Sequence, residues 1–123
     1  MAEEKIVNAR IGKVSLSMAD HGVLTYYIPL EIGRGSFCAI GGRVIGHGYL
    51  GADEFEGSAI GLEAMMRIMD TVGVEKWEDL DGKLVRVVDT GWGGRITKIG
   101  NILEDKWFDD DEFYEKELEK RNP

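Results

Sequence analysis

SAIGLEAMMRIMDTV, residues 58–72, is the stretch that decides the fold, because it has the pattern of an amphipathic helix inside a strand-rich chain. Ser58 is a suitable N-cap residue, and Gly73 suits the position just beyond the C-terminal end. Apolar residues repeat at i, i+3, i+4 and i+7 and continue one step further: Leu62, Met65, Met66, Met69 and Val72. We expect a helix whose methionine-rich face covers a sheet. Methionines in such a stripe usually fill a core, although a subunit contact stays open.

The residues before this helix have the pattern of β-strands joined by turns. Apolar positions in residues 5–18 change parity around Gly12, which predicts a β-bulge. Asp20-His21-Gly22 is typical of a tight turn, and residues 23–32 alternate between two faces over their whole length. Pro29 has no N–H to donate, so we expect this strand to be an edge strand or to turn an unpaired amide position outward.

Five further elements complete the predicted order: a short strand over 36–41, one helical turn over 75–80, strands over 83–89 and 95–103, and an acidic helix over 110–121. Consecutive strands joined by short turns form antiparallel sheets, and the helix over 58–72 needs a sheet face to cover. The predicted class is α+β, an antiparallel β-sheet packed by one central methionine-rich helix, plus a short acidic C-terminal helix. We expect residues 1–109 to form a single ligand-binding domain, with residues 110–123 as its acidic helix and tail.

Negative charge is concentrated near the C-terminus of this chain of 123 residues. The formal net charge is −8, and residues 104–119 alone contain nine acidic and two basic residues. Each phosphate of a nucleic acid needs a nearby cation, so we expect no binding of long nucleic acid. A small anion held by a few well-placed groups is compatible with this charge.

The sequence shows no sign of export or membrane insertion. No apolar run approaches the roughly 18 residues of a membrane span, and the N-terminal MAEEKIVNAR lacks the apolar centre of a signal peptide. Cys38 is the only cysteine, which excludes an intrachain disulfide and suits a reducing compartment. We therefore expect a cytoplasmic protein.

Catalytic and metal-binding motifs are absent or weak. The chain contains no HExxH, GxSxG or GxxxxGK[ST] motif and no zinc-ligand spacing. Cys38 and His47 are conceivable as a nucleophile and its base, but a small buried cysteine and a loop histidine form the simpler interpretation. His47 with Asp53, Glu54 and Glu56 is weakly suggestive of a metal loop, and a solvated acidic loop before a helix is favoured. We predict no catalytic residue, no metal and no cofactor.

Aromatic, cationic and amide side chains in the second half of the chain are typical of a site that stacks a base and holds phosphates. The candidate ligand-binding residues are Arg67, Trp92, Arg95, Asn101 and Lys106. Trp92 lies between glycines in a turn, where it is either tucked under the sheet or exposed as a stacking platform. Asn101 shares strand parity with two apolar residues, so its amide either satisfies neighbouring backbone or reads the edge of a ligand.

Other members of this group also have structural interpretations. Arg67 lies off the apolar stripe of its helix and is most simply exposed to solvent, and Lys106 most simply pairs with the adjacent Asp105. Trp107 and Phe108 are expected mainly to pack, because they precede a helix that must be held on the sheet.

Three segments of the chain resemble one known family: DHGVLTYYIPLEIGRGSF (20–37), GLEAMMRIMDTVGVEKWEDLDGKLVRV (61–87) and IGNILEDKWF (99–108). They are similar to the phage Thoeris anti-defence proteins of the first-described sponge type. The similarity covers most of residues 6–108. Its marks are the D-H-G-x-L-T turn and strand, the helix ending in T-V-G-V-x-x-W-E-x-L-x-G-K, and the closing D-K-W-F.

This resemblance implies a specific function. Proteins of that family are encoded by phages and prophages, and in the bacterial cytoplasm they bind, without cleaving, the cyclic ADP-ribose isomers made by TIR-domain proteins. Sequestering glycocyclic ADP-ribose blocks Thoeris signalling. The resemblance also implies a homodimer, or a hexamer built from dimers that holds the cyclic di- or trinucleotides of CBASS defence at a separate site.

Two other classes of function stay open. The first is a small acidic protein-interaction module whose helix over 110–121 docks on a basic host protein. The second is a small hydrolase that uses Cys38 and His47. The basic residues of the tail, Lys116, Lys120 and Arg121, could also reach the pocket of a partner subunit.

Overall fold

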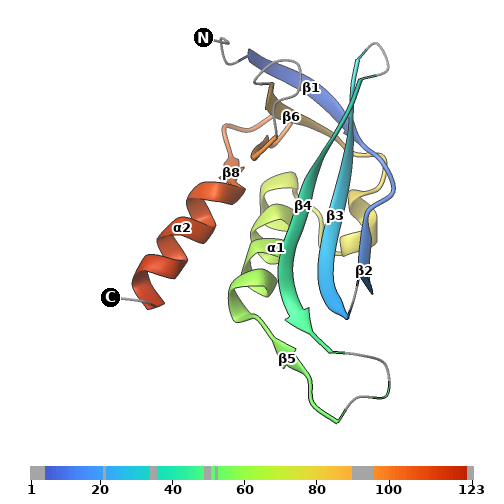
Figure 1. The fold of residues 1–123 in the computed structure, drawn as a ribbon. Coiled ribbons are helices and arrows are strands. Elements are labelled where there is room, and N and C mark those ends of the chain that lie inside the picture. The colour runs from blue at the N-terminus through green and yellow to red at the C-terminus, as the bar shows by residue number, and fades with distance from the viewer. Residues whose placement is uncertain are drawn as a thin grey trace.

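A curled antiparallel β-sheet and two α-helices make up the part of the chain described in this computed structural model, residues 5–20, 22–33, 36–48, 51, 53–89 and 96–121 (Figure 1). Residues 19, 20, 36, 37, 42 and 121 are described by their backbone alone. The strands are β1 Lys5–Ile11, β2 Ser15–Asp20, β3 Val23–Ile32, β4 Ser36–His47, β5 Glu56–Gly57, β6 Leu84–Asp89, β7 Lys98–Gly100 and β8 Trp107–Asp109. The helices are α1 Ala59–Val72, the short 3₁₀ helix η1 Trp77–Leu80, and α2 Asp110–Arg121. This architecture confirms the predicted α+β class.

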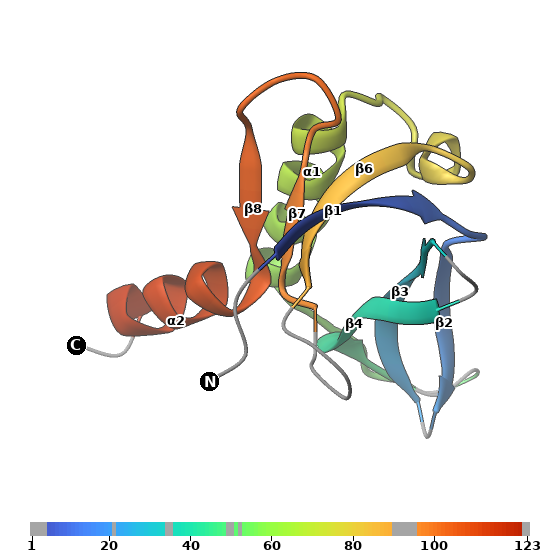
Figure 2. The ribbon, with the colours of Figure 1, turned by 90° about the horizontal axis from the view of Figure 1, so that it is seen from above.

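The strand order explains how the sheet encloses α1. The strands lie in the order β5-β4-β3-β1-β6-β7-β8, and β2 pairs with β3 beside β1. Helix α1 contacts β4 near one end of this order and β7 and β8 at the other. The sheet must therefore curl round the helix, and Figure 2 shows β7 and β8 beside α1, well apart from β2 and β3.

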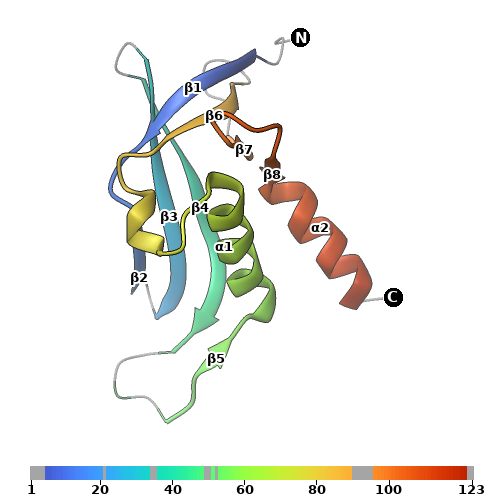
Figure 3. The same cartoon turned by 180° about the vertical axis from the view of Figure 1, so that it is seen from behind.

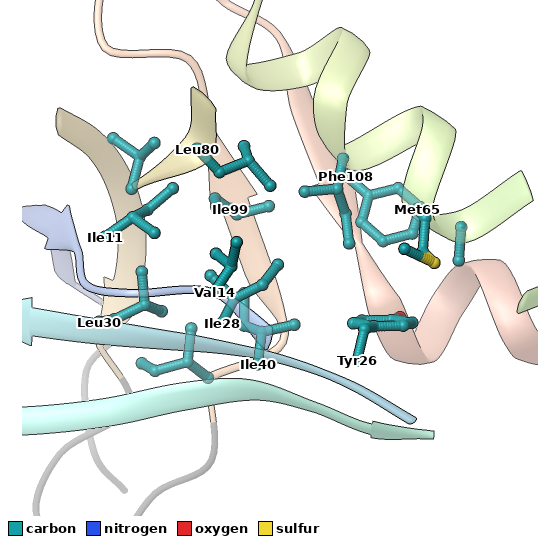
Figure 4. Close-up of a cluster of buried hydrophobic side chains, with 14 of the residues drawn as sticks. Ile11, Val14, Tyr26, Ile28, Leu30, Ile40, Met65, Leu80, Ile99 and Phe108 are labelled. Carbon is teal, nitrogen blue, oxygen red and sulfur yellow. The ribbon is translucent and has the colours of Figure 1, made fainter. Parts of the chain in front are cut away.

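The core fills the space inside this curl. Figure 4 shows side chains of β3 and β4 directed toward those of β7, η1 and α1. The labelled members are Ile11, Val14, Tyr26, Ile28, Leu30, Ile40, Met65, Leu80, Ile99 and Phe108. Every second residue of β3 from Tyr26 to Leu30 is buried, as its alternating pattern predicts.

Residues 5–18 form two strands, where the sequence predicted one bulged strand. β1 ends at Ile11 and β2 begins at Ser15, and both pair with β3. The break lies opposite Pro29, whose carbonyl accepts a hydrogen bond of 2.9 Å from the N–H of Gly12. The N–H and C=O of a strand residue face the same neighbour, so the missing N–H of Pro29 points at the break. The expectation of an edge strand was wrong, because β3 lies between β4 and the β1–β2 pair.

Helix α1 begins and ends where its sequence predicts, but it buries a different face. The Ser58 hydroxyl accepts a hydrogen bond of 3.1 Å from the N–H of Gly61, and Gly73 closes the helix with a φ of 93°. The buried positions are Gly61, Ala64, Met65, Ile68 and Thr71. Leu62 and Met66, two members of the predicted stripe, are 56% and 61% exposed. Small residues bring the helix axis close to β4, and this rotates the larger apolar residues outward.

Several predicted boundaries differ from those observed. β4 continues to His47 beyond the predicted end at residue 41, because Gly41 has a φ of 138° and fits against the backbone of Tyr26. The strand predicted over 95–103 is limited to β7 among the described residues, and the short strands β5 and β8 were not predicted. The helix over 110–121 is confirmed as α2.

Candidate functional site

An open groove of about 370 Å³ lies between α1, β8 and α2. Its lining comes from one residue of α1, three of β8 and five of α2: Arg67, Trp107, Phe108, Asp109, Glu112, Phe113, Lys116, Glu117 and Lys120. Figures 1 and 3 show α2 leaving β8 and running beside α1. Ligand pockets of small molecules start at about 300 Å³, so this groove, which we call the α1–α2 groove, can admit a compact ligand or part of a larger one.

Aromatic side chains form the floor of the α1–α2 groove. Phe108 is only 6% exposed, and its ring centroid lies 5.5 Å from that of Phe113. Trp107 is half-buried over Gly100, and its indole N–H donates to the carboxylate of Asp105 at 3.1 Å. The expectation that Trp107 and Phe108 mainly pack is thus confirmed. Their exposed edges still offer the groove an apolar surface.

Three cations surround this floor, and each is held by a carboxylate of its own helix. The guanidinium Nε of Arg67 lies 2.7 Å from Glu63, and its Cζ lies 5.6 Å from the centroid of the Phe113 ring. On α2, Lys116 pairs with Glu112 at 2.6 Å, and Lys120 pairs with Glu117 at 3.3 Å. The Glu117 side chain is 13% exposed, whereas the Arg67 and Lys116 pairs lie at the surface. Surface ion pairs contribute about 0–1 kcal/mol, so an incoming anion can compete for Arg67 and Lys116 at little cost.

Protonation states in the groove follow from these pairs. The hydrogen bond from Lys116 lowers the pKa of Glu112, and the same bond raises the pKa of Lys116. Both groups therefore keep their charges near neutral pH. The lining holds as many carboxylates as cations, so a bound anion must draw the cations toward itself and away from the carboxylates.

Asn101 and Lys106 lie at the C-terminal end of α1. The Asn101 amide donates to the carbonyls of Thr71 and Val72 at 3.0 and 3.3 Å, and its Oδ1 accepts from the N–H groups of Leu103 and Glu104, each at 2.9 Å. Of the two interpretations of Asn101, the structure shows the one in which the amide satisfies backbone. This arrangement caps the helix and shapes the loop that follows β7.

Lys106 joins the same loop to α1. Its Nζ donates to the carbonyl of Asp70 at 3.0 Å and lies 3.1 Å from the Asp70 carboxylate. The predicted pair with the adjacent Asp105 is replaced by this longer-range pair. Arg67 and Asp70 are about one helical turn apart on α1, so Arg67 and Lys106 approach the same end of the helix.

The five candidate ligand-binding residues are therefore only partly brought together. Arg67 lines the α1–α2 groove, and Asn101 and Lys106 hold the loop beside it. Trp92 and Arg95 lie outside the described residues. The groove residues of α2 were not among the candidates, although Lys116 and Lys120 are spaced i, i+4 and could have indicated one face of that helix.

A second surface depression, of about 470 Å³, has the opposite character. Its charged lining consists of four carboxylates and one lysine: Glu75, Glu78, Asp79, Asp81 and Lys83. An anion would be repelled there, so the α1–α2 groove is the better candidate for a phosphate-bearing ligand.

The residues considered for catalysis and metal binding are not gathered into a site. Cys38 and His47 both belong to β4, and nine residues of strand span roughly 30 Å. Burial raises the pKa of the Cys38 thiol, and the charge of Asp89 raises it further, so thiolate formation is disfavoured. Within the described ranges, no group of three or more histidine, cysteine or acidic side chains is placed to hold a metal ion.

Comparisons with known proteins give no relative for this chain. No family model, no curated protein and no solved structure matches it. Among the helices of the described residues, none is both long enough and apolar enough to cross a membrane.

Proposed function

We propose that this chain binds a small, phosphate-bearing nucleotide in the α1–α2 groove and sequesters it without cleaving it. The observation that carries the proposal is the combination of an aromatic floor with three surrounding cations, Arg67, Lys116 and Lys120, in an open groove of about 370 Å³. Aromatic rings stack on bases, and guanidinium and ammonium groups hold phosphates. Both kinds of contact are needed for a nucleotide, and the groove offers both.

The resemblance of residues 20–37, 61–87 and 99–108 to the Thoeris anti-defence sponges makes the proposal more specific. The ligand is then a cyclic ADP-ribose isomer produced by a TIR-domain protein, with glycocyclic ADP-ribose as the first candidate, and the protein acts in the cytoplasm of an infected bacterium. A sponge competes with an effector by mass action, so its affinity must exceed that of the effector at the concentrations in the cell.

A subunit contact is part of this proposal. Leu62 and Met66 are exposed side by side on α1, one turn apart, and an exposed apolar pair on a helix is suited to a second copy of the chain. The homodimer would place two α1–α2 grooves in one particle. Cyclic di- or trinucleotides, which the resemblance adds at a separate site, are included as test ligands.

Titration calorimetry on the full-length protein tests the function. We expect saturable binding of at least one cyclic ADP-ribose isomer, and recovery of the intact nucleotide after the protein is denatured. Recovery of a hydrolysed product would replace the sponge with an enzyme. Absence of binding to every cyclic ADP-ribose isomer and cyclic oligonucleotide would reject the proposal.

A second candidate function is favoured by the position of α2. The helix points away from the sheet toward the C-terminus (Figures 1 and 3), and half of the Leu118 side chain is exposed on it. A basic host protein could dock on the acidic residues of this helix. Reversing the charge of the exposed Glu115 and Glu119 would abolish such docking and leave nucleotide binding unchanged, so the two functions give opposite results.

A further inference from the structure

A buried carboxylate joins the first turn of α2 to the sheet. The side chain of Asp110 is completely buried, with 0% exposure. The hydroxyl of Tyr26, on β3, donates to its Oδ1 at 3.3 Å, and Nε of Arg43, on β4, donates to its Oδ2 at 3.4 Å. The backbone N–H of Asp110 also donates to the carbonyl of Thr97 at 2.8 Å. We call Asp110, Tyr26 and Arg43 the latch.

The charges and protonation states of the latch residues complement one another: a neutral phenol and a cationic guanidinium donate to an anionic carboxylate. Burying a carboxylate without partners is very costly, so the positions of the Tyr26 hydroxyl and the Arg43 guanidinium are tied to that of Asp110. Burial raises the pKa of Tyr26, and the charge of Asp110 raises it further, so the phenol stays a neutral donor. Burial works to lower the pKa of Arg43, but the charge of Asp110, the hydrogen bond to it and the charge of Asp111 act together against burial, and the net direction is upward.

Arg43 also contacts two further residues of α2, which lie outside the latch. Another nitrogen of its guanidinium donates to Asp111, and its Cζ lies 4.4 Å from the centroid of the Tyr114 ring. The hydroxyl of Tyr114 is buried and has no hydrogen bond of normal geometry among the described residues, although it lies close enough to Tyr26 for that residue to influence the pKa of Tyr114. Two side chains of the sheet, Tyr26 and Arg43, therefore contact α2 within its first five residues, at Asp110, Asp111 and Tyr114.

The far half of α2 is more exposed than the first turn, apart from Glu117, whose side chain is 13% exposed. Leu118 is half exposed, and the side chains of Lys116 and Lys120 are 67% and 72% exposed. Figure 3 shows this half of the helix standing apart from the strands. Yet this half supplies Lys116 and Lys120 to the α1–α2 groove. The position of one wall of the groove therefore depends on contacts made at the other end of the helix.

We propose that Asp110 is the positioning residue of the α1–α2 groove: its latch to Tyr26 and Arg43 holds α2 in place, and opening the latch releases that wall while α1 and the sheet stay folded. The central core supports this division, because the fully buried residues of β3, β6, β7 and α1 pack on one another, and among the buried core residues only Tyr114 belongs to α2. Release of α2 therefore opens the groove without emptying the core. The effect on a ligand rests on the proposed function, whereas the release itself does not.

Hydrogen exchange measured by mass spectrometry on the full chain tests the release without any ligand. In Asp110→Asn, which keeps the shape of the side chain, we expect the amides of residues 114–121 to exchange about tenfold to a hundredfold faster, with α1 and β3 unchanged. Tyr26→Phe removes a single hydroxyl from the latch and should shift the same amides in the same direction by less. This second variant keeps the test decisive if Asp110→Asn does not fold.

Asp111→Asn is the matched control, because it changes the neighbouring, partly exposed carboxylate and leaves the buried one in place. We expect much smaller acceleration in this variant. Faster exchange spread evenly over α1, β3 and α2 would overturn the proposal, since Asp110 would then support the whole fold. Unchanged exchange in α2 would overturn it as well.

Calorimetry with a cyclic ADP-ribose isomer then links the latch to the groove. We expect Asp110→Asn to weaken binding by about tenfold or more while Asp111→Asn retains most of the affinity. If Asp110→Asn releases α2 and still binds the nucleotide as tightly as the parent protein does, then the position of α2 does not determine binding. That result would overturn the role of Asp110 in positioning the groove. If neither the variants nor the parent protein bind the nucleotide, the proposed function is rejected. The hydrogen-exchange data then still show whether the latch holds α2.

Discussion

Gly100 of β7 lies directly beneath the indole of Trp107 in β8, its register partner on the neighbouring strand. A Cβ atom at position 100 would lie 2.7 Å from Cδ2 of the ring, which is closer than packed carbon atoms approach. The absence of a side chain at Gly100 is thus what lets Trp107 lie flat on the sheet and form part of the groove floor. Arg86 covers the tryptophan ring, with its Cζ 5.0 Å from the ring centroid.

Replacing Gly100 with alanine should displace Trp107. We expect Gly100→Ala to lower the free energy of unfolding by about 1–3 kcal/mol, because an added methyl group in a packed site forces its neighbours to move. Urea unfolding monitored by far-UV circular dichroism measures this loss. Gly57→Ala on β5 is the control, since open space surrounds that position, and it should stay within about 0.5 kcal/mol of the parent protein. Equal stabilities of the two variants would mean that the indole does not rest on Gly100.

Gly61 should reverse the usual effect of alanine in a helix. Gly→Ala inside a helix normally stabilises it by about 1 kcal/mol. A Cβ at Gly61, however, would lie 2.5 Å from Cβ of Ile45 and closer still to its Cγ2. We expect Gly61→Ala to lower the free energy of unfolding by about 1–3 kcal/mol. In an Ile45→Ala background this penalty should shrink, and a double-mutant cycle in urea would fail to show coupling if the two residues did not meet.

Removing Arg67 should separate binding from stability. Arg67→Ala deletes a groove cation that pairs with Glu63 on the surface of the same helix, so the free energy of unfolding should change by less than about 0.5 kcal/mol. If Arg67 holds a phosphate, the dissociation constant for the cyclic ADP-ribose isomer should rise about tenfold or more. Lys76→Ala, an exposed cation away from the groove, is the control. Equal affinities of both variants would exclude Arg67 from the site.

The exposed pair Leu62 and Met66 should govern self-association. We expect Leu62→Gln combined with Met66→Gln to weaken or abolish the proposed dimer, and to change the stability of the monomer little, because neither side chain belongs to the core. Sedimentation velocity over a range of concentrations reports the association state. Leu103→Gln removes an even more exposed apolar residue from a loop and should leave the association unchanged. A dimer that persists in the double variant would place the interface elsewhere.

Alkaline pH should destabilise the protein through Tyr26. Burial raises the pKa of this phenol above its ordinary value of about 10, so the unfolded chain releases the proton at a lower pH than the folded protein does. The unfolded state then binds fewer protons, and the free energy of unfolding should fall as the pH rises above about 10, by at most about 1.4 kcal/mol per pH unit for this group.

Urea unfolding at pH 8 and at pH 11 measures the alkaline loss of stability. Tyr26→Phe should lose less stability between these two pH values than the parent protein, whereas Tyr27→Phe, at the half-exposed neighbouring position, should match the parent protein. A Tyr26→Phe variant with the same pH dependence as the parent would assign the loss to other groups. Tyr114, whose pKa burial also raises, would be examined next.

Only part of the candidate site could be predicted from the sequence. Arg67 is a member of the groove, and the packing of Trp107 and Phe108 followed from their place before a helix. The groove itself arises where α1 and α2 meet, and no local pattern reports which two helices will be neighbours. Asn101 illustrates the same limit, because its strand parity indicated a buried amide but the partners Thr71 and Val72 lie on another element.

The sequence by itself determined the local features of this protein. Ser58 and Gly73 set the ends of α1 by hydrogen bonding within one turn, and the alternation in residues 23–32 set the inward face of β3. Only the tertiary structure decided which side of α1 is buried, why Pro29 is tolerated inside the sheet, and how Asp110 meets Tyr26 and Arg43. Asp110 meets residues more than sixty positions away, Pro29 faces a break in the neighbouring strands at Gly12, and the buried side of α1 depends on how closely two backbones approach. All three are set by the packing of the whole chain and not by a local pattern.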